Sequence, residues 1–526
     1  MNNVKFGPFL GINHRRPDDS MRVRSAQVQG DYLRGALNVD INNVMALQRR
    51  KRAVLFQAMT GAHSLFLTSD TAGFLVRASA LYAITLPTYT ETLLKTLSSD
   101  DAMSYVAQGD DVFYSNGTDS GRIMGGAVYP LGLPTPDAPT LKTIGGNLLA
   151  GNYLVSIGYS NTTTGEEGGL SDRTRLMLSE TGGVRVTLPA ATTGATHVNV
   201  YLSGANGEVP QWAASVAAGT ASVDLIDLAT GREAPLRREE PLPAGSLFWS
   251  SGRLCSFHGS ALYLGLPYKA GYYDPLAGYL PFPDTVSVAI DAQAGIFVAA
   301  DKTYWIPADG MVSDVLPYGA VPGTAFSLPD RSMYGWFGRK GIVLASPSGE
   351  VDAVMSDSIA LTAPTSGIST VFEEDEYRKV VSCGWCMNLT NKAVTQYSGW
   401  GFTSFSRGYG TMGDGIYTLA TGGEVGWSVD FGKTNLGAPT LKHLPSAYLG
   451  VESDEPLQLR VQAPGPNSGD YTYLARSCDE ELQMQRIDVG KGLRSTWFEL
   501  ELTSENGTDF KLASVDFVPA ISKRRI

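Results

Sequence analysis

Two cysteines stand at the spacing that redox pairs and zinc sites use, in Cys383-Gly384-Trp385-Cys386. A redox C-x-x-C pair needs a thioredoxin-like βαβ setting, and a zinc site needs a second pair of ligands nearby. The surrounding sequence has neither pattern. We therefore interpret the two cysteines as part of a strand end or a turn, and we predict no metal site.

A glycine-rich segment at 408–413 matches the dinucleotide-binding pattern G-x-G-x-x-G. That turn holds a pyrophosphate only when it follows a strand and opens a helix, whose N-terminal amides contact the ligand. Here Ile416-Tyr417-Thr418-Leu419 follows, which is typical of a strand. The segment therefore predicts a hairpin, and we predict no cofactor.

A second segment, 426–434, is similar to a phosphate-binding loop. Five residues separate Gly426 from Gly432-Lys433-Thr434, whereas the phosphate cradle has four at this position. Trp427, Val429 and Phe431 alternate with polar residues, as a half-buried strand does. The segment therefore predicts a strand.

Clusters of carboxylates could serve glycoside hydrolysis, which needs two of them flanking the scissile bond. The clusters are Asp100-Asp101, Asp110-Asp111, Glu166-Glu167 and Glu373-Glu374-Asp375-Glu376. Most of them adjoin turn residues, where solvation explains them. The run at 373–376 is better interpreted as a charged loop facing a pore. An enzyme stays open as an alternative, but we predict that the chain is not one and has no catalytic residues.

The histidines and serines supply no recognisable catalytic motif. None of the five histidines stands in H-E-x-x-H, and no G-x-S-x-G elbow exists. The histidines are His14, His63, His197, His258 and His443. A catalytic triad is assembled in space, so sequence alone does not exclude one, but nothing in the chain indicates one.

Short apolar runs, paired across turns of glycine, aspartate or serine, are the commonest pattern in the chain. Such turns accept positive φ, so the pattern predicts β-hairpins. The clearest hairpins lie at 64–76, 105–114, 254–264, 286–298 and 334–344, with a further strand at 302–306. They recur at roughly 40–50 residues, the period of propeller blades, which bury their apolar faces only against neighbours. We predict an all-β fold with a β-propeller.

Two segments depart from this series. Residues 140–236 lie between a proline-rich linker at 131–139 and a second linker at 235–243. Alternating runs at 152–159, 184–188, 197–202 and 223–225 predict an inserted β-sandwich of the immunoglobulin or fibronectin type there. Residues 441–526 alternate at 446–451, 457–461, 496–502 and 510–517, which predicts one antiparallel sheet with a solvated face.

These segments divide the chain into four predicted parts. Residues 1–139 contain an N-terminal segment and the first blades, 140–236 the sandwich, 237–440 the remaining blades, and 441–526 a C-terminal β module. The N- and C-terminal sheets are expected to pair, because propellers often close with strands from both ends. Helix signals are almost absent, and 90–97 is the best candidate.

Composition and charge exclude several classes of protein. The chain has 526 residues, 59 Gly, 28 Pro, 18% charged residues and a net charge of −11. A negative body argues against tight phosphate binding, although nucleic acid could still pass through a channel that repels it. Residues 1–52 hold ten basic and four acidic residues, so this stretch either docks on an acidic neighbour or is a solvated surface. Four cysteines fit a reducing cytoplasm, and no apolar run approaches the ~18 residues of a membrane helix.

Motifs near both ends resemble those of the β-propeller nozzle proteins of short-tailed bacteriophages. Leu37-Asn38-Val39-Asp40 and Arg49-Arg50 match the family's strand and turn, although Lys51 and Arg52 replace a glycine. The C-terminal matches are Lys491-Gly492-Leu493, Trp497-Phe498, Asp509-Phe510-Lys511-Leu512, Pro519 and Arg524-Arg525. The central matches are Tyr272-Tyr273-Asp274-Pro275, Gly295-Ile296-Phe297-Val298 and Lys302-Thr303-Tyr304. The order of these motifs carries the resemblance.

The resemblance implies a structural virion protein. Such proteins form a ring, usually a homo-hexamer, below the portal and adaptor, where they line and gate the channel for DNA ejection. The implied partners are further copies of the chain, the adaptor and portal-proximal proteins, and tail fibres or spikes. Residues 441–526 would dock on neighbouring tail proteins. DNA would pass without sequence-specific binding, and the protein, made in the host cytoplasm, would reside in the virion tail.

Two other functions stay open. The chain could be a tail receptor-binding or adhesin module, in which the sandwich at 140–236 contacts a host surface. It could also be a propeller enzyme that degrades polysaccharide.

Overall fold

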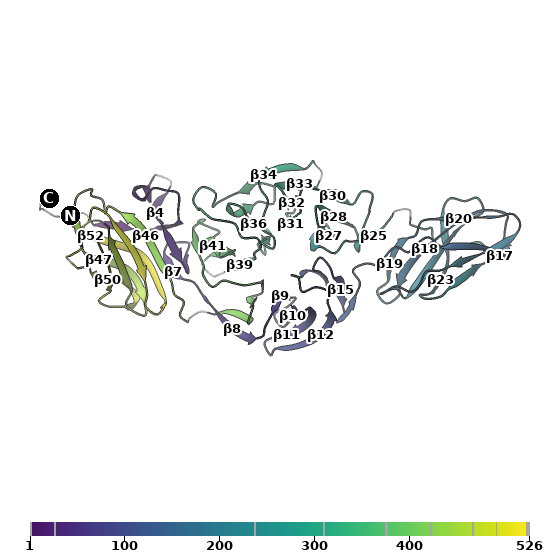
Figure 1. Ribbon diagram of the computed structural model, residues 1–526, viewed down its shortest axis with the longest axis horizontal. Coiled ribbons are helices and arrows are strands. Elements are labelled where there is room, and N and C mark those ends of the chain that lie inside the picture. Colours follow the sequence, from purple (N-terminus) through teal and green to yellow (C-terminus); the bar gives the residue numbers. More distant parts are fainter. Residues whose placement is uncertain are drawn as a thin grey trace. The chain divides into compact units, whose positions relative to one another are not determined.

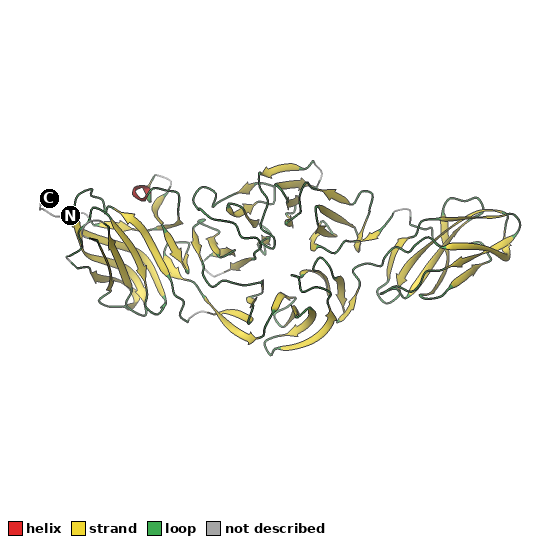
Figure 2. Cartoon of the chain, in the orientation of Figure 1, coloured by secondary structure: helices red, strands yellow, loops and turns green. Residues whose placement is uncertain are grey.

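The computed structural model describes residues 3–25, 28–235, 238–308, 311–373, 377–420, 423–464, 468–490 and 492–521. Strands and loops make up nearly all of these residues, and the helical segment η1 (Asp18–Ser20) is a single 3-10 turn (Figure 2). The all-β prediction is confirmed. Within the described ranges no helix is long and apolar enough to cross a membrane. The chain divides into two compact units, Met1–Leu65 with Ala294–Ile526, and Phe66–Gln293.

Four-stranded antiparallel sheets recur in the first unit (Figure 1). One has the order β35-β36-β37-β38, and another has the order β43-β44-β45-β8. Strands β32, β33 and β34 form a similar antiparallel run. The strands are β8 (Arg52–Ala58), β32 (Gly295–Ala299), β33 (Thr303–Pro307), β34 (Ser313–Leu316), β35 (Phe326–Ser327), β36 (Tyr334–Gly338), β37 (Gly341–Ala345), β38 (Val351–Asp352), β43 (Ser404–Ser406), β44 (Tyr409–Met412) and β45 (Gly415–Ala420). Because β8 pairs with β45, one sheet combines strands from distant parts of the chain.

Two larger sheets complete the first unit. A six-stranded sheet has the order β50-β47-β52-β7-β6, with β1 also paired to β52, and a nine-stranded sheet has the order β39-β40-β41-β42-β5-β46-β51-β48-β49. The first consists of β1 (Val4–Phe6), β6 (Val39–Ile41), β7 (Leu47–Arg49), β47 (Lys442–Ser453), β50 (Asp479–Asp488) and β52 (Phe510–Ile521). The second consists of β5 (Gly35–Leu37), β39 (Ser369–Glu373), β40 (Arg378–Ser382), β41 (Trp385–Asn388), β42 (Val394–Gln396), β46 (Ser428–Thr434), β48 (Gln458–Ala463), β49 (Gly469–Leu474) and β51 (Phe498–Thr503).

The single C-terminal sheet predicted for 441–526 is wrong in its topology. β47 and β52 belong to the six-stranded sheet, whereas β48 and β51 belong to the nine-stranded sheet. Buried side chains from all four strands lie in one apolar cluster, including Leu449, Leu459, Leu500 and Phe517. Alternation correctly marks one buried face on each strand, but it does not say in which sheet that strand pairs.

The N-terminal segment forms a small sheet of its own, with the order β2-β4-β3. It contains β2 (Phe9–Ile12), β3 (Arg22–Arg24) and β4 (Gln29–Leu33). Phe6, Phe431 and Phe517 lie edge to face, with ring centroids 5.4–5.9 Å apart. These rings join the N-terminal strands to the C-terminal ones, and β1 and β7 both pair with β52. The expected pairing of the N- and C-terminal sheets is therefore observed.

The second unit begins within β9 (Ala62–Leu67) and ends after β31 (Val288–Asp291). It contains an antiparallel run β10-β11-β12, a four-stranded sheet β13-β14-β15-β16, and a sheet of order β25-β29-β28-β27-β26 with β30 paired to β28. The strands are β10 (Ala72–Arg77), β11 (Ala80–Thr85), β12 (Thr90–Thr96), β13 (Ser104–Gln108), β14 (Asp111–Ser115), β15 (Ser120–Met124), β16 (Ala127–Tyr129), β25 (Glu240–Pro241), β26 (Ser246–Ser250), β27 (Arg253–His258), β28 (Ala261–Leu266), β29 (Lys269–Tyr273) and β30 (Tyr279–Pro281).

The helix expected at 90–97 does not form. These residues make β12, which pairs with β11 along its whole length. Its three threonines are β-branched and fit a pleated strand better than a helix. Among the described strands β12 pairs with β11 alone, and most of its residues are exposed. An exposed edge strand lacks the strong alternation that marks a half-buried strand, which explains the wrong prediction.

Residues 140–225 form a β-sandwich within the second unit. One sheet has the order β17-β21-β24, and the other has the order β19-β18-β22-β23 with β20 also paired to β18. The strands are β17 (Thr140–Leu148), β18 (Gly151–Asn161), β19 (Glu166–Leu170), β20 (Thr174–Leu178), β21 (Gly182–Thr187), β22 (His197–Ser203), β23 (Pro210–Ala217) and β24 (Ser222–Leu225). Both sheets contribute to one core, in which Val155, Val184 and Val200 are fully buried.

Candidate functional site

A buried carboxylate, Asp40 on β6 of the six-stranded sheet, connects the N-terminal motif to strands β40 and β41 of the nine-stranded sheet. Its Oδ2 accepts a hydrogen bond from Lys379 Nζ at 2.6 Å, and the two side chains are 3% and 4% exposed. Three further groups donate to the same carboxylate: Tyr397 Oη, Tyr377 Oη at 3.4 Å, and Cys386 Sγ at 3.4 Å. A buried charge is tolerated only when it is paired and hydrogen-bonded, and Asp40 meets both conditions.

This cluster, hereafter the Asp40 cluster, is unsuited to chemistry. Burial raises the pKa of the Cys386 thiol far above its ordinary value, and the Asp40 charge adds to the effect. Burial likewise raises the pKa of Tyr397. A thiol becomes nucleophilic when its pKa is lowered in an exposed, electropositive setting, which is the opposite environment. The Asp40 cluster therefore joins strands and offers no reactive group.

The C-x-x-C segment is the tip of a β-hairpin. Ser382 and Trp385 pair across the turn, and Cys383 and Gly384 have φ values of 51° and 77°. Two successive residues with positive φ define the type I′ turn that suits the twist of a two-residue hairpin. The interpretation of these cysteines as a turn is confirmed. All four cysteines, Cys478 included, are free thiols.

Asn38 and Arg50 form a second set of buried polar contacts beside the Asp40 cluster. Asn38 Nδ2 donates to Ser398 Oγ and to the Gly426 carbonyl, both at 2.7 Å. Its Oδ1 accepts from Ser398 N at 2.9 Å and from Arg50 Nε at 2.8 Å. The amide thus uses both donors and both acceptor positions. Asn38 has a φ of 56°, which asparagine tolerates better than most residues.

The Arg50 guanidinium is almost enclosed by the same part of the fold. It lies over the rings of Tyr397 and Trp400, 5.2 and 5.4 Å from their centroids. Burial lowers the pKa of Arg50, while nearby Tyr397 and Asp40 oppose that shift. Stacking on two aromatic rings stabilises a weakly hydrated guanidinium in such a setting.

Arg49 connects the two ends of the chain that carry the resemblance. Its guanidinium pairs with Asp509, with Nη2 and Oδ2 3.3 Å apart. Leu47 and Gln48 of β7 pair with Leu512 and Lys511 of β52. The motif at 37–50 therefore lies directly beside the motif at 509–512. Lys491 and Arg524-Arg525, which also carry the resemblance, lie outside the described residues.

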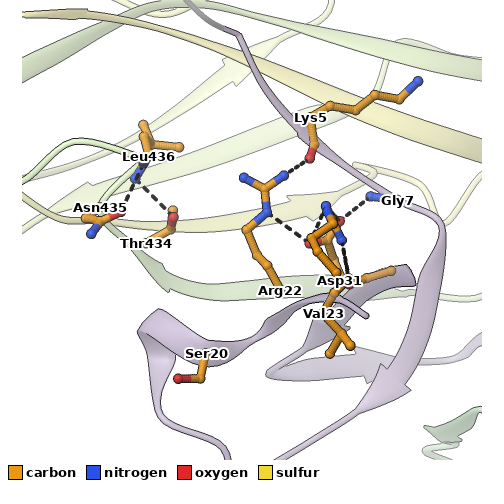
Figure 3. Close-up of polar contacts among 12 residues, drawn as sticks. Lys5, Gly7, Ser20, Arg22, Val23, Asp31, Thr434, Asn435 and Leu436 are labelled. Atoms are coloured by element: carbon orange, nitrogen blue, oxygen red, sulfur yellow. Dashed lines mark hydrogen bonds and ion pairs between the residues drawn. The ribbon is translucent and has the colours of Figure 1, made fainter. Parts of the chain in front are cut away.

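A second buried carboxylate, Asp31, fixes the small N-terminal sheet (Figure 3). Asp31 accepts from the Gly7 amide at 2.8 Å, from Arg22 Nε at 3.1 Å and from Arg24 Nη2 at 3.2 Å. Arg22 also donates to the Lys5 carbonyl, so its guanidinium bridges the first strand and Asp31. Part of the basic charge of residues 1–52, for which docking on an acidic neighbour and a solvated surface were both open, is therefore used within the N-terminal segment.

The glycine motifs have the structures predicted for them. Residues 408–413 make the turn and second strand of a hairpin, and β45 follows without a helix. Residues 428–434 are strand β46, on which Val429 and Phe431 are buried. Neither segment has a helix N-terminus that could hold a phosphate group.

Several of the carboxylates considered for glycoside hydrolysis have polar partners of their own. Asp111 forms an ion pair with Arg122, and Asp100 accepts from the Ser79 amide. Glu373 pairs with Arg378 at 2.9 Å. Glu374, Asp375 and Glu376, the remainder of the run predicted to face a pore, lie outside the described residues.

Glu166 and Glu167 are the first two residues of β19 and follow directly on the turn at 162–165. Burial raises the pKa of Glu166, and Tyr272, Arg122 and Lys269 offset only part of that shift. Burial alone would also raise the pKa of Glu167, but hydrogen bonds from Tyr201, Asn199 and Arg232 outweigh it and lower the value. Consecutive strand residues point to opposite faces, so this pair does not flank a single bond.

The sequence did not predict the partners of Asp40 in the Asp40 cluster. Lys379 stands between Arg378 and Val380, and nothing in its local pattern marks it as buried. Asp40 and Lys379 are 339 residues apart in the sequence, so only the fold brings them together. Within the described residues no group of His, Cys, Asp or Glu is arranged to hold a metal ion.

No protein-family model matches the chain, and no curated protein matches it. Distant likenesses to solved structures exist. The computationally designed Ika8 protein is 12% identical with a TM-score of 0.25, and covers 65% of this chain and 98% of its own. A glycoside hydrolase family 43 arabinoxylan arabinofuranohydrolase from Bacillus subtilis is 10% identical with a TM-score of 0.21, over 80% and 96%. The extracellular domain of BT4673 from B. thetaiotaomicron is 9% identical with a TM-score of 0.22, over 90% and 94%. At such TM-scores these likenesses carry no argument.

Proposed function

We propose that the chain is a structural protein of the virion that forms a ring-shaped tail nozzle below the portal and adaptor. In this role it lines and gates the channel through which the genome is ejected. Its partners are further copies of itself, usually six in a ring by the resemblance, the adaptor, and tail fibres or spikes. It is not an enzyme.

This proposal rests on one observation: the two motifs that resemble the nozzle proteins, at 37–50 and 509–512, lie side by side. Arg49 pairs with Asp509, and β7 pairs with β52. Asn38, Asp40 and Arg50 make buried contacts with the strands and loops between residues 377 and 400. Proteins of one fold are expected to share the buried residues that hold distant strands together. Here these residues are the ones that resemble the nozzle proteins.

The finer fold that this role requires is a β-propeller with an inserted immunoglobulin- or fibronectin-like sandwich and a C-terminal β module. Successive four-stranded antiparallel sheets are the units from which propellers are built. The sheet that combines β8 with β43, β44 and β45 joins an early strand to late ones. A propeller needs such a joint to close its series of blades without leaving a long exposed edge.

Charge also favours this role over nucleic-acid recognition. The chain carries a net charge of −11, and a ring of identical copies multiplies it. A channel with a negative lining repels phosphate and lets DNA slide, whereas a sequence-reading protein needs a basic face.

The contacts of the candidate carboxylates favour an enzymatic role less. Glu166 and Glu167, the part-buried pair, lie next to each other on one strand. Asp100, Asp111 and Glu373 each make hydrogen bonds or ion pairs near the surface. A retaining or inverting hydrolase needs two carboxyl groups facing each other across a sugar.

The proposal is tested by producing virions without this chain. We expect such particles to contain the portal and adaptor, to package DNA and then to lose it, because the channel has no closure. Supplying the chain in trans should restore DNA retention, and supplying Lys379→Met, which disrupts the Asp40 cluster, should not. Particles that retain their genome without the chain, or that lack no tail component, would exclude the nozzle role.

A further inference from the structure

The β-sandwich contains a pocket of about 380 Å³ on the sheet that includes β18, β19 and β20. Its walls come from Ser156 on β18, Leu170 at the end of β19, Asp172 and Arg173 in the β19–β20 connection, and Ala234 and Arg238 in the segment that leaves the sandwich. This volume lies within the range of small-molecule sites.

The backbone that forms the pocket is held in place independently of any ligand. Ser171 N donates to the Ile157 carbonyl at 2.8 Å, and Ser171 Oγ accepts from Ile157 N at 3.0 Å. On the other side, Ala234 N donates to the Pro210 carbonyl at 2.8 Å. Thr135 Oγ1 donates to the Glu239 carbonyl at 3.1 Å. These hydrogen bonds hold the described backbone around Ser171 and Ala234 in place, and binding sites for small ligands are usually pre-formed in this way.

One buried polar group on the pocket wall lacks a partner. Ser156 is 2% exposed, and its hydroxyl makes no hydrogen bond to any described residue. A hydroxyl that is buried without a partner costs free energy, so native proteins seldom keep one. At a pocket wall, a bound ligand can supply the missing hydrogen bond.

The pocket is lined by two guanidinium groups and only one carboxylate. Arg238 Nη2 contacts Asp172 Oδ1 at 2.9 Å, and the side chains are 64% and 78% exposed. Arg173 Nη1 donates to the Glu208 carbonyl at 2.9 Å. Each arginine has five N–H donors and uses few of them in these contacts. The lining thus carries two guanidinium groups and one carboxylate, and guanidinium groups bind carboxylates through paired N–H donors.

We propose that this pocket binds a carboxylate-bearing sugar, such as a uronic acid residue of a polysaccharide. Arg173 and Arg238 would bind the carboxylate. Ser156 Oγ and Asp172 would exchange hydrogen bonds with sugar hydroxyls, while Leu170 and Ala234 would contact the apolar face of the ring. An acidic side chain of a peptide would satisfy the arginines, but it lacks the several hydroxyl groups that a sugar presents to Ser156 Oγ and Asp172. This binding activity goes beyond the nozzle function and does not depend on it.

Binding is tested by titrating the full chain with sodium glucuronate, glucose and N-acetylglutamate amide, followed by calorimetry or saturation-transfer NMR. We expect saturable binding of glucuronate with a dissociation constant on the order of 1 mM or tighter. Glucose and the glutamate derivative should each bind at least about tenfold more weakly, because each lacks one half of the recognition. Equal binding of glucose, stronger binding of the glutamate derivative, or no saturable binding of glucuronate would each overturn the proposal.

Variants connect binding to the named residues. Arg173→Met combined with Arg238→Met should weaken glucuronate binding by about ten- to a hundredfold, the range for charged hydrogen bonds. The matched control is Arg185→Met, which removes an exposed arginine paired with Asp224 elsewhere on the same sandwich and should leave binding unchanged. Unchanged binding in the double variant would contradict the assignment.

Ser156→Ala separates recognition from a structural role. The substitution removes a buried hydroxyl that has no partner among the described residues, so the fold should be as stable as before or more stable. We expect glucuronate to bind several-fold more weakly. Loss of stability together with unchanged binding would show that the hydroxyl serves the fold and would overturn its role in the pocket.

Discussion

Two charged contacts of the same chemistry have opposite settings in this protein. Asp40 and Lys379 are almost fully buried among aromatic and thiol groups, whereas Arg185 and Asp224 lie on the surface of the sandwich, 47% and 40% exposed. Water screens the exposed pair, so little stability depends on it. The buried pair has lost its hydration, and each charge depends on the other. The stability of the fold therefore depends more on the buried contacts of residues 37–50 than on the exposed pair.

The largest effect is expected from breaking the buried pair. Lys379→Met leaves the Asp40 carboxylate buried without its counter-charge, and we expect the sheet around β40 to lose about 3–5 kcal/mol of stability. Native-state hydrogen exchange, followed by mass spectrometry of peptides from β40 and β41, reports this region separately from the second unit. In the matched variant Arg185→Met, the exchange of peptides from β21 and β24 should change little, because water screens the exposed pair. Similar losses at the two sites would break the comparison.

Asn38→Ala is expected to have the next largest effect. It removes four hydrogen bonds, leaves Arg50 with an unpaired Nε, and places alanine at positive φ. We expect a loss of about 2–4 kcal/mol in peptides from β5, β6 and β42. Asn38→Asp keeps the acceptor for Arg50 and should cost less. If the aspartate variant is the less stable one, the Arg50 contact is not what makes Asn38 important.

Substitutions of Cys383 in the type I′ turn test whether this cysteine has a structural role or a reactive one. Cys383→Asn creates the Asn-Gly pair that this turn favours and should stabilise the hairpin by about 0.5–1 kcal/mol. Cys383→Val puts a β-branched residue at a φ of 51° and should destabilise it by about 1–2 kcal/mol. Native-state hydrogen exchange of peptides from β40 and β41 measures both. A lower stability of the asparagine variant than of the valine variant would contradict the turn assignment.

The adjacent glutamates of β19 should give small pH effects of opposite sign. The pKa of Glu167 is lowered from 4.5 in the folded chain, so its contribution to stability is present above about pH 4.5 and is lost as the pH falls through the folded pKa. The pKa of Glu166 is raised from 4.5, so its ionised form opposes folding at neutral pH, and this penalty disappears at acidic pH.

Glutamine variants separate these two effects. Glu167→Gln should destabilise the sandwich at pH 7, with a difference from wild type that shrinks below pH 4.5. Glu166→Gln should stabilise it at pH 7, again with a difference that shrinks in acid. Thermal unfolding of the full chain across pH 3–7 provides the measurement. The same sign of effect at neutral pH for both variants would refute the assigned environments.

The sequence was sufficient for the local elements. Residues 254–264 and 334–344 form hairpins as predicted, because glycines and small polar residues at their turns allow the required backbone angles. Alternation likewise identified β18, β21 and β22 of the sandwich. These are short-range properties, and a single sequence records them directly.

The sequence does not indicate which distant strands and side chains pair. Nothing near Lys379 indicates that it neutralises Asp40, and nothing near Leu457 indicates that β48 joins a different sheet from β47. Alternation reports that a strand has a buried face, but the identity of its partner depends on chain topology. The pocket was missed for the same reason, since Ser156, Arg173 and Arg238 come from three separate segments.

The ring around a passage that we propose is tested most directly by electron microscopy of the purified protein and of intact virions with the chain labelled. We expect a closed ring with a central channel, located at the tail below the portal. Single particles without a central opening, both in solution and in the virion, would contradict it.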